Sequence, residues 1–90
     1  MTDIQKTLLT ELLQESYKHG FGTYYPLADL AKKHGLTREE VYDGNTETGI
    51  LMEWGPKGIG CLDVLEGGRI AAISMDMRES LENWTGFRYC

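Results

Sequence analysis

The chain has 90 residues, of which 41% are hydrophobic and 26% charged, and its formal net charge is −5 at pH 7. This length leaves room for one modest hydrophobic core, so we predict a single domain over residues 1–90. No apolar run is long enough to cross a bilayer and no secretory signal is visible, so we expect a cytoplasmic protein that does not enter membranes.

The first predicted helix covers residues 3–19. Apolar residues recur there with the period of one helix face: Ile4, Leu8, Leu9, Leu12, Leu13 and Tyr17. Thr2 and Gln5 have the spacing of a capping box at its start. Gly20 follows the helix at the point where a left-handed residue ends many helices. We therefore expect an amphipathic helix with signals at both ends.

A loop containing two glycines leads from this helix into a β-prone aromatic pair, Tyr24 and Tyr25, which we expect to form a minimal edge strand. Pro26 suits the first position of a second helix. Apolar residues at helical spacing continue to His34, and Gly35 ends the run.

Thr37 and Glu40 repeat the capping-box spacing and begin a third helix. The turn before it has about three or four residues, the length found in helix-turn-helix units. Four residues keep a helical rhythm through the next stretch, which is rich in poor helix formers: Val41, Asn45, Thr48 and Met52. We therefore predict a long third helix that ends near Gly55. The alternative breaks the helix at Asp43 and makes residues 49–54 a strand.

Residues 59–65 and 69–74 are rich in strand formers and are separated by the turn signal Gly67-Gly68, so we predict a β-hairpin. Asp76 can cap a short final helix through Trp84, which an aromatic tail follows. The predicted fold class is α+β, with a three-helix core, a C-terminal β-hairpin and a short final helix.

Ten apolar residues make up the predicted core: Ile4, Leu8, Leu12, Leu27, Leu30, Val41, Leu62, Val64, Ile70 and Ile73. Cys61 is expected to point inward from the first hairpin strand. Because an intracellular chain keeps its thiols reduced, we read the two cysteines, Cys61 and Cys90, as a core residue and a tail residue. Neither a disulfide nor a zinc scaffold is expected.

Residues 30–41, LAKKHGLTREEV, resemble the helix-turn-helix families. Ala31, Gly35 and Val41 fall where these families have a small contact residue, a turn glycine and an apolar anchor. The order helix, short strand, helix, turn, helix, hairpin is similar to that of the winged-helix domain family. The resemblance implies a winged-helix-like fold for the chain.

In winged-helix families the third helix usually enters the major groove and the hairpin contacts the DNA backbone. The resemblance implies DNA contacts from the third helix by Arg38, Tyr42, Asn45, Thr46 and Thr48. It implies phosphate contacts by Lys32, Lys33, Lys57 and Arg69. Residues 39–53, however, contain five acidic side chains and no basic one. This charge opposes DNA binding, and the lysines then form an ordinary solvated helix face.

Two functions remain open from the sequence. Its charge favours a winged-helix-like protein-interaction or regulatory module, and its element order favours a DNA-binding transcriptional regulator. Trp84, Phe87 and Tyr89 are the candidate contacts for a protein partner or a homodimer. Alternatively, the tail folds over the first helix as a lid.

No motif in the chain indicates catalysis. Residues 43–54 resemble a calcium loop, but its glycine and glutamate positions hold Thr48 and Trp54. His19 and His34 stand at helix C termini, where a cation is favoured, and need no chemical role. We therefore expect a protein that is not an enzyme and has no metal or cofactor.

Overall fold

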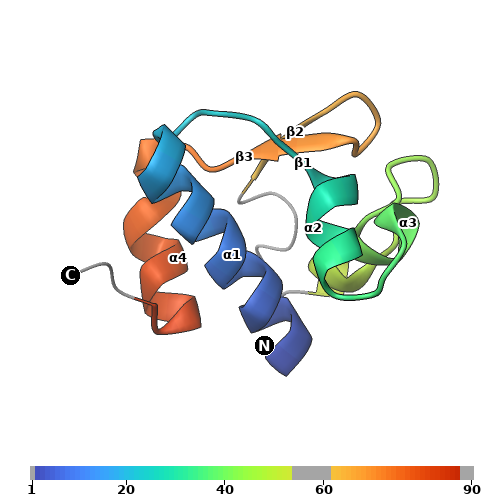
Figure 1. The fold of residues 1–90 in the computed structure, drawn as a ribbon, viewed down its shortest axis with the longest axis horizontal. Coiled ribbons are helices and arrows are strands. Elements are labelled where there is room, and N and C mark those ends of the chain that lie inside the picture. The colour runs from blue at the N-terminus through green and yellow to red at the C-terminus, as the bar shows by residue number, and fades with distance from the viewer. Residues whose placement is uncertain (1, 54–61, 88–90) are drawn as a thin grey trace.

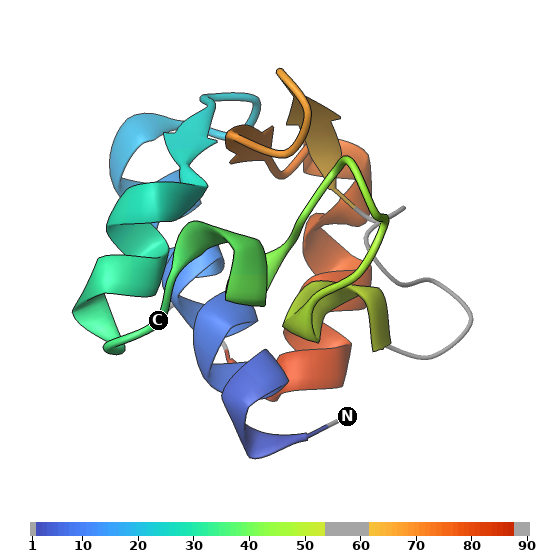
Figure 2. The same cartoon turned by 90° about the vertical axis from the view of Figure 1, so that its right-hand side faces the viewer.

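The computed structural model describes residues 2–53 and 62–87. Its elements in chain order are α1 (Asp3–His19), β1 (Tyr25–Pro26), α2 (Leu27–Lys33), α3 (Arg38–Val41), the 3-10 helix η1 (Ile50–Glu53), β2 (Asp63–Leu65), β3 (Ile70–Ala72), the 3-10 helix η3 (Met75–Met77) and α4 (Arg78–Thr85). The fold is α+β, and its small sheet lies at one end of the molecule above the helices (Figures 1 and 2).

Helix α1 has the bounds that the sequence predicts. The Thr2 side chain accepts a hydrogen bond from the Gln5 backbone N–H at 3.3 Å, and the Gln5 side chain accepts one from the Thr2 N–H at 2.8 Å. At the other end Gly20 has a φ of 101° and donates to the Ser16 carbonyl. The two ends are therefore closed by local hydrogen bonds, which is why they are readable from the sequence.

The sheet has three antiparallel strands in the order β1-β3-β2, with Tyr25 opposite Ala71 and Leu65 opposite Ile70. The predicted hairpin is confirmed over β2 and β3, but its turn has the four residues 66–69 between the paired strands instead of two. Glu66, Gly67 and Gly68 all have positive φ. Three successive left-handed residues widen the connection beyond a two-residue turn.

The start of the second helix differs from its prediction by one residue. Pro26 belongs to the edge strand β1, where its missing N–H leaves no gap in the hydrogen bonding of the sheet. The helix begins at Leu27, whose N–H donates to the Arg69 carbonyl at 2.9 Å. This bond joins the start of α2 to the end of the hairpin turn.

The turn between α2 and α3 follows the prediction. Gly35 has a φ of 69°, and the N–H of Leu36 returns to the Ala31 carbonyl at 3.0 Å. Thr37 and Glu40 then form the expected capping box of α3, with bonds of 2.9 and 3.2 Å. The left-handed glycine and the new cap together redirect the chain within four residues, 34–37.

The long third helix is a wrong prediction, because α3 ends at Val41. Asp43 and Thr48 instead pair across a tight turn with backbone bonds of 2.7 and 3.3 Å, and the Asp43 carboxylate accepts from the Asn45 N–H at 2.9 Å. Short polar side chains compete for backbone groups in this way and so disfavour helices. The alternative prediction agrees with the structure in ending the helix before Asp43, but its strand is wrong, since Ile50–Glu53 form the 3-10 helix η1.

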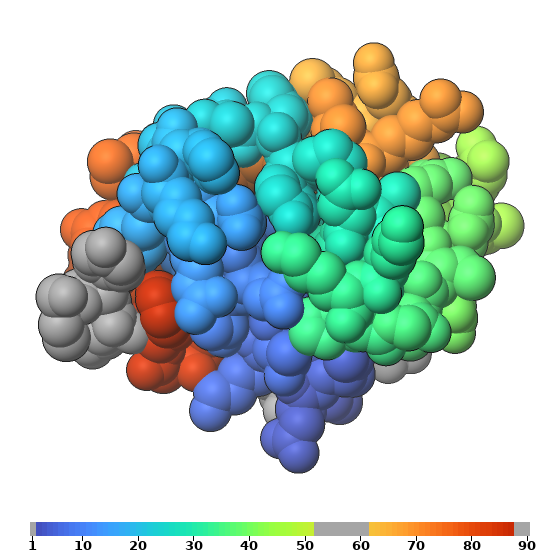
Figure 3. Space-filling view, in the orientation of Figure 1, coloured from blue at the N-terminus to red at the C-terminus, as the bar shows by residue number. Residues whose placement is uncertain are grey.

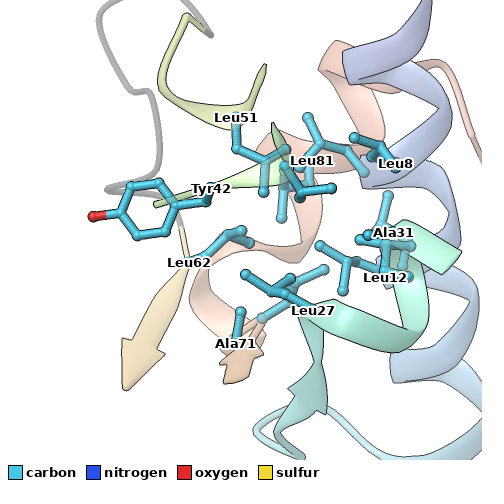
Figure 4. Packing of buried hydrophobic residues seen from close by; sticks show 14 residues of the cluster. Leu8, Leu12, Leu27, Ala31, Tyr42, Leu51, Leu62, Ala71 and Leu81 are labelled. Carbon is cyan, nitrogen blue, oxygen red and sulfur yellow. The ribbon is translucent and has the colours of Figure 1, made fainter. Parts of the chain in front are cut away.

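The core is made largely of leucine. Its buried members include Leu8, Leu9, Leu12 and Leu13 of α1, Leu27, Leu30 and Ala31 of α2, Val41 of α3, Leu51 of η1, Leu62 just before β2, Ala71 of β3, Ile73 just after β3, and Leu81 of α4. We call these residues the leucine core; they converge from the helices and the sheet, while the Tyr42 hydroxyl points outward at its rim (Figure 4). Of the predicted core, Ile4 is 37% exposed and Val64 and Ile70 are only half-buried.

The final helix begins later than predicted. Asp76 lies within η3 instead of capping the helix, and the N-cap of α4 is Met77, whose side chain makes no capping bond. A 3-10 turn here takes the place of a side-chain cap.

The predicted inward position of Cys61 falls outside the described residues. None of the helices in residues 2–53 and 62–87 has both the length and the apolar composition needed to cross a bilayer.

Candidate functional site

Two turns meet at the end of the molecule where DNA contacts were predicted. We call residues 38–48 and 66–69 the turn face; its two parts adjoin in Figure 3, coloured green to yellow-green and orange. A Cβ added to Gly44 would lie 2.1 Å from the Gly67 carbonyl oxygen, and one added to Gly68 would lie 2.8 Å from the Tyr42 ring. Side-chain atoms could not fit at these contacts, so the two turns touch through glycine backbone.

The turn face is mainly acidic. It carries five carboxylates and two guanidinium groups: Glu39, Glu40, Asp43, Glu47 and Glu66 against Arg38 and Arg69. Except for half-buried Asp43, these carboxylates are exposed. The Arg38 side chain is only 21% exposed, and its Nη2 donates to Glu39 at 3.2 Å. The net charge that a ligand would meet at the turn face is therefore negative.

The predicted base-contacting residues do not share a helix. Tyr42 is 9% exposed and packs beside Gly68. Asn45, Thr46 and Thr48 lie together in the tight turn after α3, where the Thr46 and Thr48 hydroxyls are 2.7 Å apart. The turn thus groups three polar side chains, but they lie on a loop and not on a recognition helix.

The basic residues of α2 are also divided. Lys32 is exposed, whereas the Lys33 Nζ lies 3.9 Å from the Glu15 carboxylate and 5.9 Å from the centre of the Tyr25 ring. The hydrogen bond and charge of Tyr25 raise the pKa of Lys33. His34 lies 2.8 Å from the Glu11 carboxylate.

Lys33 and His34 therefore both interact with α1, although the Lys33 side chain remains 51% exposed. The partners are 18 and 23 residues apart in the chain, so sequence spacing gave no signal of these pairs. Arg69 stays exposed at the hairpin turn. Lys57 lies outside the described residues.

A polar network joins α1 to α4 at the opposite side of the molecule. The Tyr17 hydroxyl donates to one oxygen of the Glu82 carboxylate. The Arg78 Nη1 donates to the other oxygen at 3.1 Å and lies 3.5 Å from the Tyr17 hydroxyl. Glu82 is only 5% exposed, and these donors compensate for burying its charge. The Tyr17 hydrogen bond and the charge of Glu82 raise the pKa of Arg78.

An open hollow of about 410 Å³ lies beside this network. Its lining residues come from the end of α1 and the start of α4, two segments that lie at the upper left of Figure 1. We call it the aromatic hollow; its lining residues are Ser16, Tyr17, Gly20, Phe21, Met75 and Arg78. Tyr17 and Phe21 meet edge to face with ring centroids 5.2 Å apart. Met75 is 63% exposed. No sequence pattern marks this site, because its residues come from two distant segments.

Of the three aromatic residues predicted to contact a protein partner, Phe87 lies close to this hollow. The Phe87 ring is 6.2 Å from that of Tyr17, which places it over α1 as the lid alternative expects. Trp84 and Phe87 are both half-buried against the leucine core. Tyr89 lies outside the described residues.

The described residues contain no group of three or more His, Cys, Asp or Glu side chains arranged to hold a metal ion. A second cavity, between α1 and β3, has a volume of about 20 Å³, enough for about one water molecule.

No protein-family model, curated protein or solved structure matches this chain. The turn face and the aromatic hollow therefore carry the functional argument.

Proposed function

We propose that the protein is a noncatalytic winged-helix-like domain that recognises another protein. The winged-helix reading is supported by the order of the elements, in which α1, β1, α2, α3 and the β2–β3 hairpin follow the family order. The observation that carries the proposal is the character of the turn face. Its helix, α3, is too short to read DNA bases along a groove, and its charged side chains are mainly acidic, whereas a DNA-binding surface is basic.

The length of α3 argues against groove reading. Four residues span about 6 Å at 1.5 Å per residue, which is about one turn of helix. A recognition helix presents several side chains to the base edges along the groove. After Val41 the chain turns away through residues 43–48, and Tyr42 is buried. Arg38 is the one basic side chain that α3 offers.

Charge adds to this argument. DNA affinity depends strongly on lysine and arginine that neutralise phosphates, and it weakens steeply with salt. At the turn face five carboxylates would approach the phosphates with two arginines, one of them paired with Glu39. Positive support for a protein partner comes from the aromatic hollow, where Met75 and aromatic side chains remain accessible.

DNA binding is the second candidate, because Lys32 and Arg69 are exposed. In that arrangement these two residues contact phosphates, and the carboxylates of α3 face away from the duplex. This binding would be salt-sensitive and would disappear when the basic residues are replaced.

The two functions are separated by an anisotropy titration with random duplex DNA at physiological salt. We expect no binding up to micromolar protein, although nonspecific DNA binders have dissociation constants of about 10⁻⁴ to 10⁻⁶ M. A quadruple variant, Lys32→Ala, Lys33→Ala, Arg38→Ala and Arg69→Ala, serves as the control. Tight, salt-sensitive binding that is lost in this variant would overturn the proposal.

A second experiment tests for the protein partner directly. The domain carries a photo-crosslinker at an exposed position and is irradiated in nuclease-treated cell extract. We expect a crosslink to one protein that survives nuclease treatment, and sedimentation of the purified domain reports whether that partner is a second copy. Crosslinks that disappear with nuclease would indicate contacts made through nucleic acid.

A further inference from the structure

The aromatic hollow has a single ionic side chain in its lining. Five of its six lining residues are aromatic, small or methionine, and Arg78 is the sixth. Met75 is the most exposed of the large hydrophobic residues in the described part of the chain. A flexible thioether adapts well to an incoming apolar group.

Arg78 is held in place before any ligand arrives. Its Nη1 donates to the buried Glu82 carboxylate and lies beside the Tyr17 hydroxyl. A guanidinium has five N–H groups in a rigid plane, so donors other than those on Nη1 remain for a further acceptor. Because Arg78 is already anchored, less side-chain entropy is lost when it binds an anion.

We propose that the aromatic hollow binds a segment of a partner protein in which a large apolar side chain lies next to a carboxylate. This inference rests on the proposed protein-binding function and names its site and ligand chemistry. The apolar side chain contacts Phe21 and Met75, and the carboxylate accepts hydrogen bonds from Arg78. A volume of about 410 Å³ has room for one aromatic or branched side chain and its neighbour.

The charges near the hollow are compatible with an acidic ligand. Glu82 lies behind Arg78 and is buried with its oxygens already bonded. Lys18, Asp76 and Glu79 are exposed and do not line the hollow. Glu79 acts electrostatically on Arg78 from outside the hollow and contributes to the raised pKa of Arg78. Within the lining, Arg78 is the charged group that a ligand meets.

The test uses the full chain labelled in its methionine methyl groups and two capped pentapeptides. One peptide has a phenylalanine flanked by two glutamates, and the other has lysines in place of the glutamates. We expect the glutamate peptide to shift the Met75 methyl resonance in a saturable titration. We expect the lysine peptide to bind about tenfold more weakly, the scale of one charge-assisted hydrogen bond.

Two variants and two matched controls locate the site. Because Met75→Asp removes the reporter methyl group, peptide binding by the variants is measured by isothermal titration calorimetry. Met75→Asp should abolish binding, and Arg78→Gln should weaken binding of the glutamate peptide about tenfold while leaving the lysine peptide nearly unchanged. Leu65→Asp and Arg69→Gln make the same replacements at exposed positions on the hairpin and should leave binding unchanged. Because Arg78 also contacts Glu82, Arg78→Lys is included and should bind with intermediate affinity.

Three outcomes would overturn the proposal: equal binding of both peptides, binding unaffected by Met75→Asp, or no shift at millimolar peptide. The proposed function is judged separately by the photo-crosslinked partner. If Met75→Asp and Arg78→Gln still crosslink to that partner, the hollow is the wrong site and protein binding stands. If the wild-type domain crosslinks to no protein, the proposed function itself fails.

Discussion

The leucine core and the turn face are built in opposite ways. In the leucine core, side chains from α1, α2, η1 and α4 fill the space between helices (Figure 4). At the turn face, the backbone of Gly67 approaches Gly44 closely because Gly44 has no side chain. The first region is stabilised by buried apolar area and the second by the close approach of two backbones. The stability of one small domain can therefore depend on large side chains in its core and on the absence of a side chain at a surface turn.

The largest effect is expected in the leucine core. Leu30 is fully buried, so Leu30→Ala removes apolar contacts and leaves a cavity. We expect the free energy of unfolding to fall by about 2 to 5 kcal/mol, measured by urea denaturation. Ile4→Ala is the control: because Ile4 is partly exposed, it should cost about 0.5 kcal/mol or less. Equal losses in the two variants would contradict the description of the core.

A smaller effect is expected at the turn face. The Cβ of Gly44→Ala would collide with the Gly67 backbone, and the two turns must separate to relieve it. We expect a loss of about 1 to 3 kcal/mol by thermal denaturation, comparable to overpacking in a core. Gly35→Ala has open space around its Cβ but a φ of 69°, so it reports conformational strain alone. If Gly44→Ala were neutral, the contact between the turns would not be present in solution.

The smallest effect is expected at the N-cap of α3, between the leucine core and the turn face. Thr37→Ala removes the oxygen that accepts the Glu40 N–H at the start of α3. The expected loss is about 1 kcal/mol, with faster hydrogen exchange of the α3 amides. Thr2→Ala removes the same kind of bond from α1 and serves as the matched comparison. Because α1 is 17 residues long and α3 only 4, exchange should increase over a larger fraction of α3.

Predictions from the sequence succeeded where a local hydrogen bond sets an element boundary. The two capping boxes and the left-handed residues Gly20 and Gly35 involve partners within a few positions, and each appears in the structure as expected. The prediction of a long third helix, which rested on the helical spacing of Val41, Asn45, Thr48 and Met52, was wrong because Asp43 favours a turn there. The Asp43 side chain accepts a hydrogen bond from the Asn45 backbone N–H, and Asp43 and Thr48 pair through their backbones to close a turn instead.

The candidate sites were less predictable than the elements. Lys33 and His34 looked like a basic patch, yet the packing of α2 beside α1 directs them to Glu15 and Glu11. The aromatic hollow joins Tyr17 to Arg78, which is 61 residues away in the chain. No spacing rule connects positions so far apart, because their distance depends on how α1 and α4 pack.

The sequence by itself determined the α+β class, the bounds of α1, the α2–α3 turn, the existence of the hairpin and the acidic charge. These properties follow from periodicity, capping and composition, which act over one or two helical turns. Only the tertiary structure decided that two glycine turns touch and that Tyr17 of α1 meets Glu82 and Arg78 of α4 beside an apolar hollow. The reason is physical: these features depend on contacts between distant segments, and only packing of the whole chain brings such segments together.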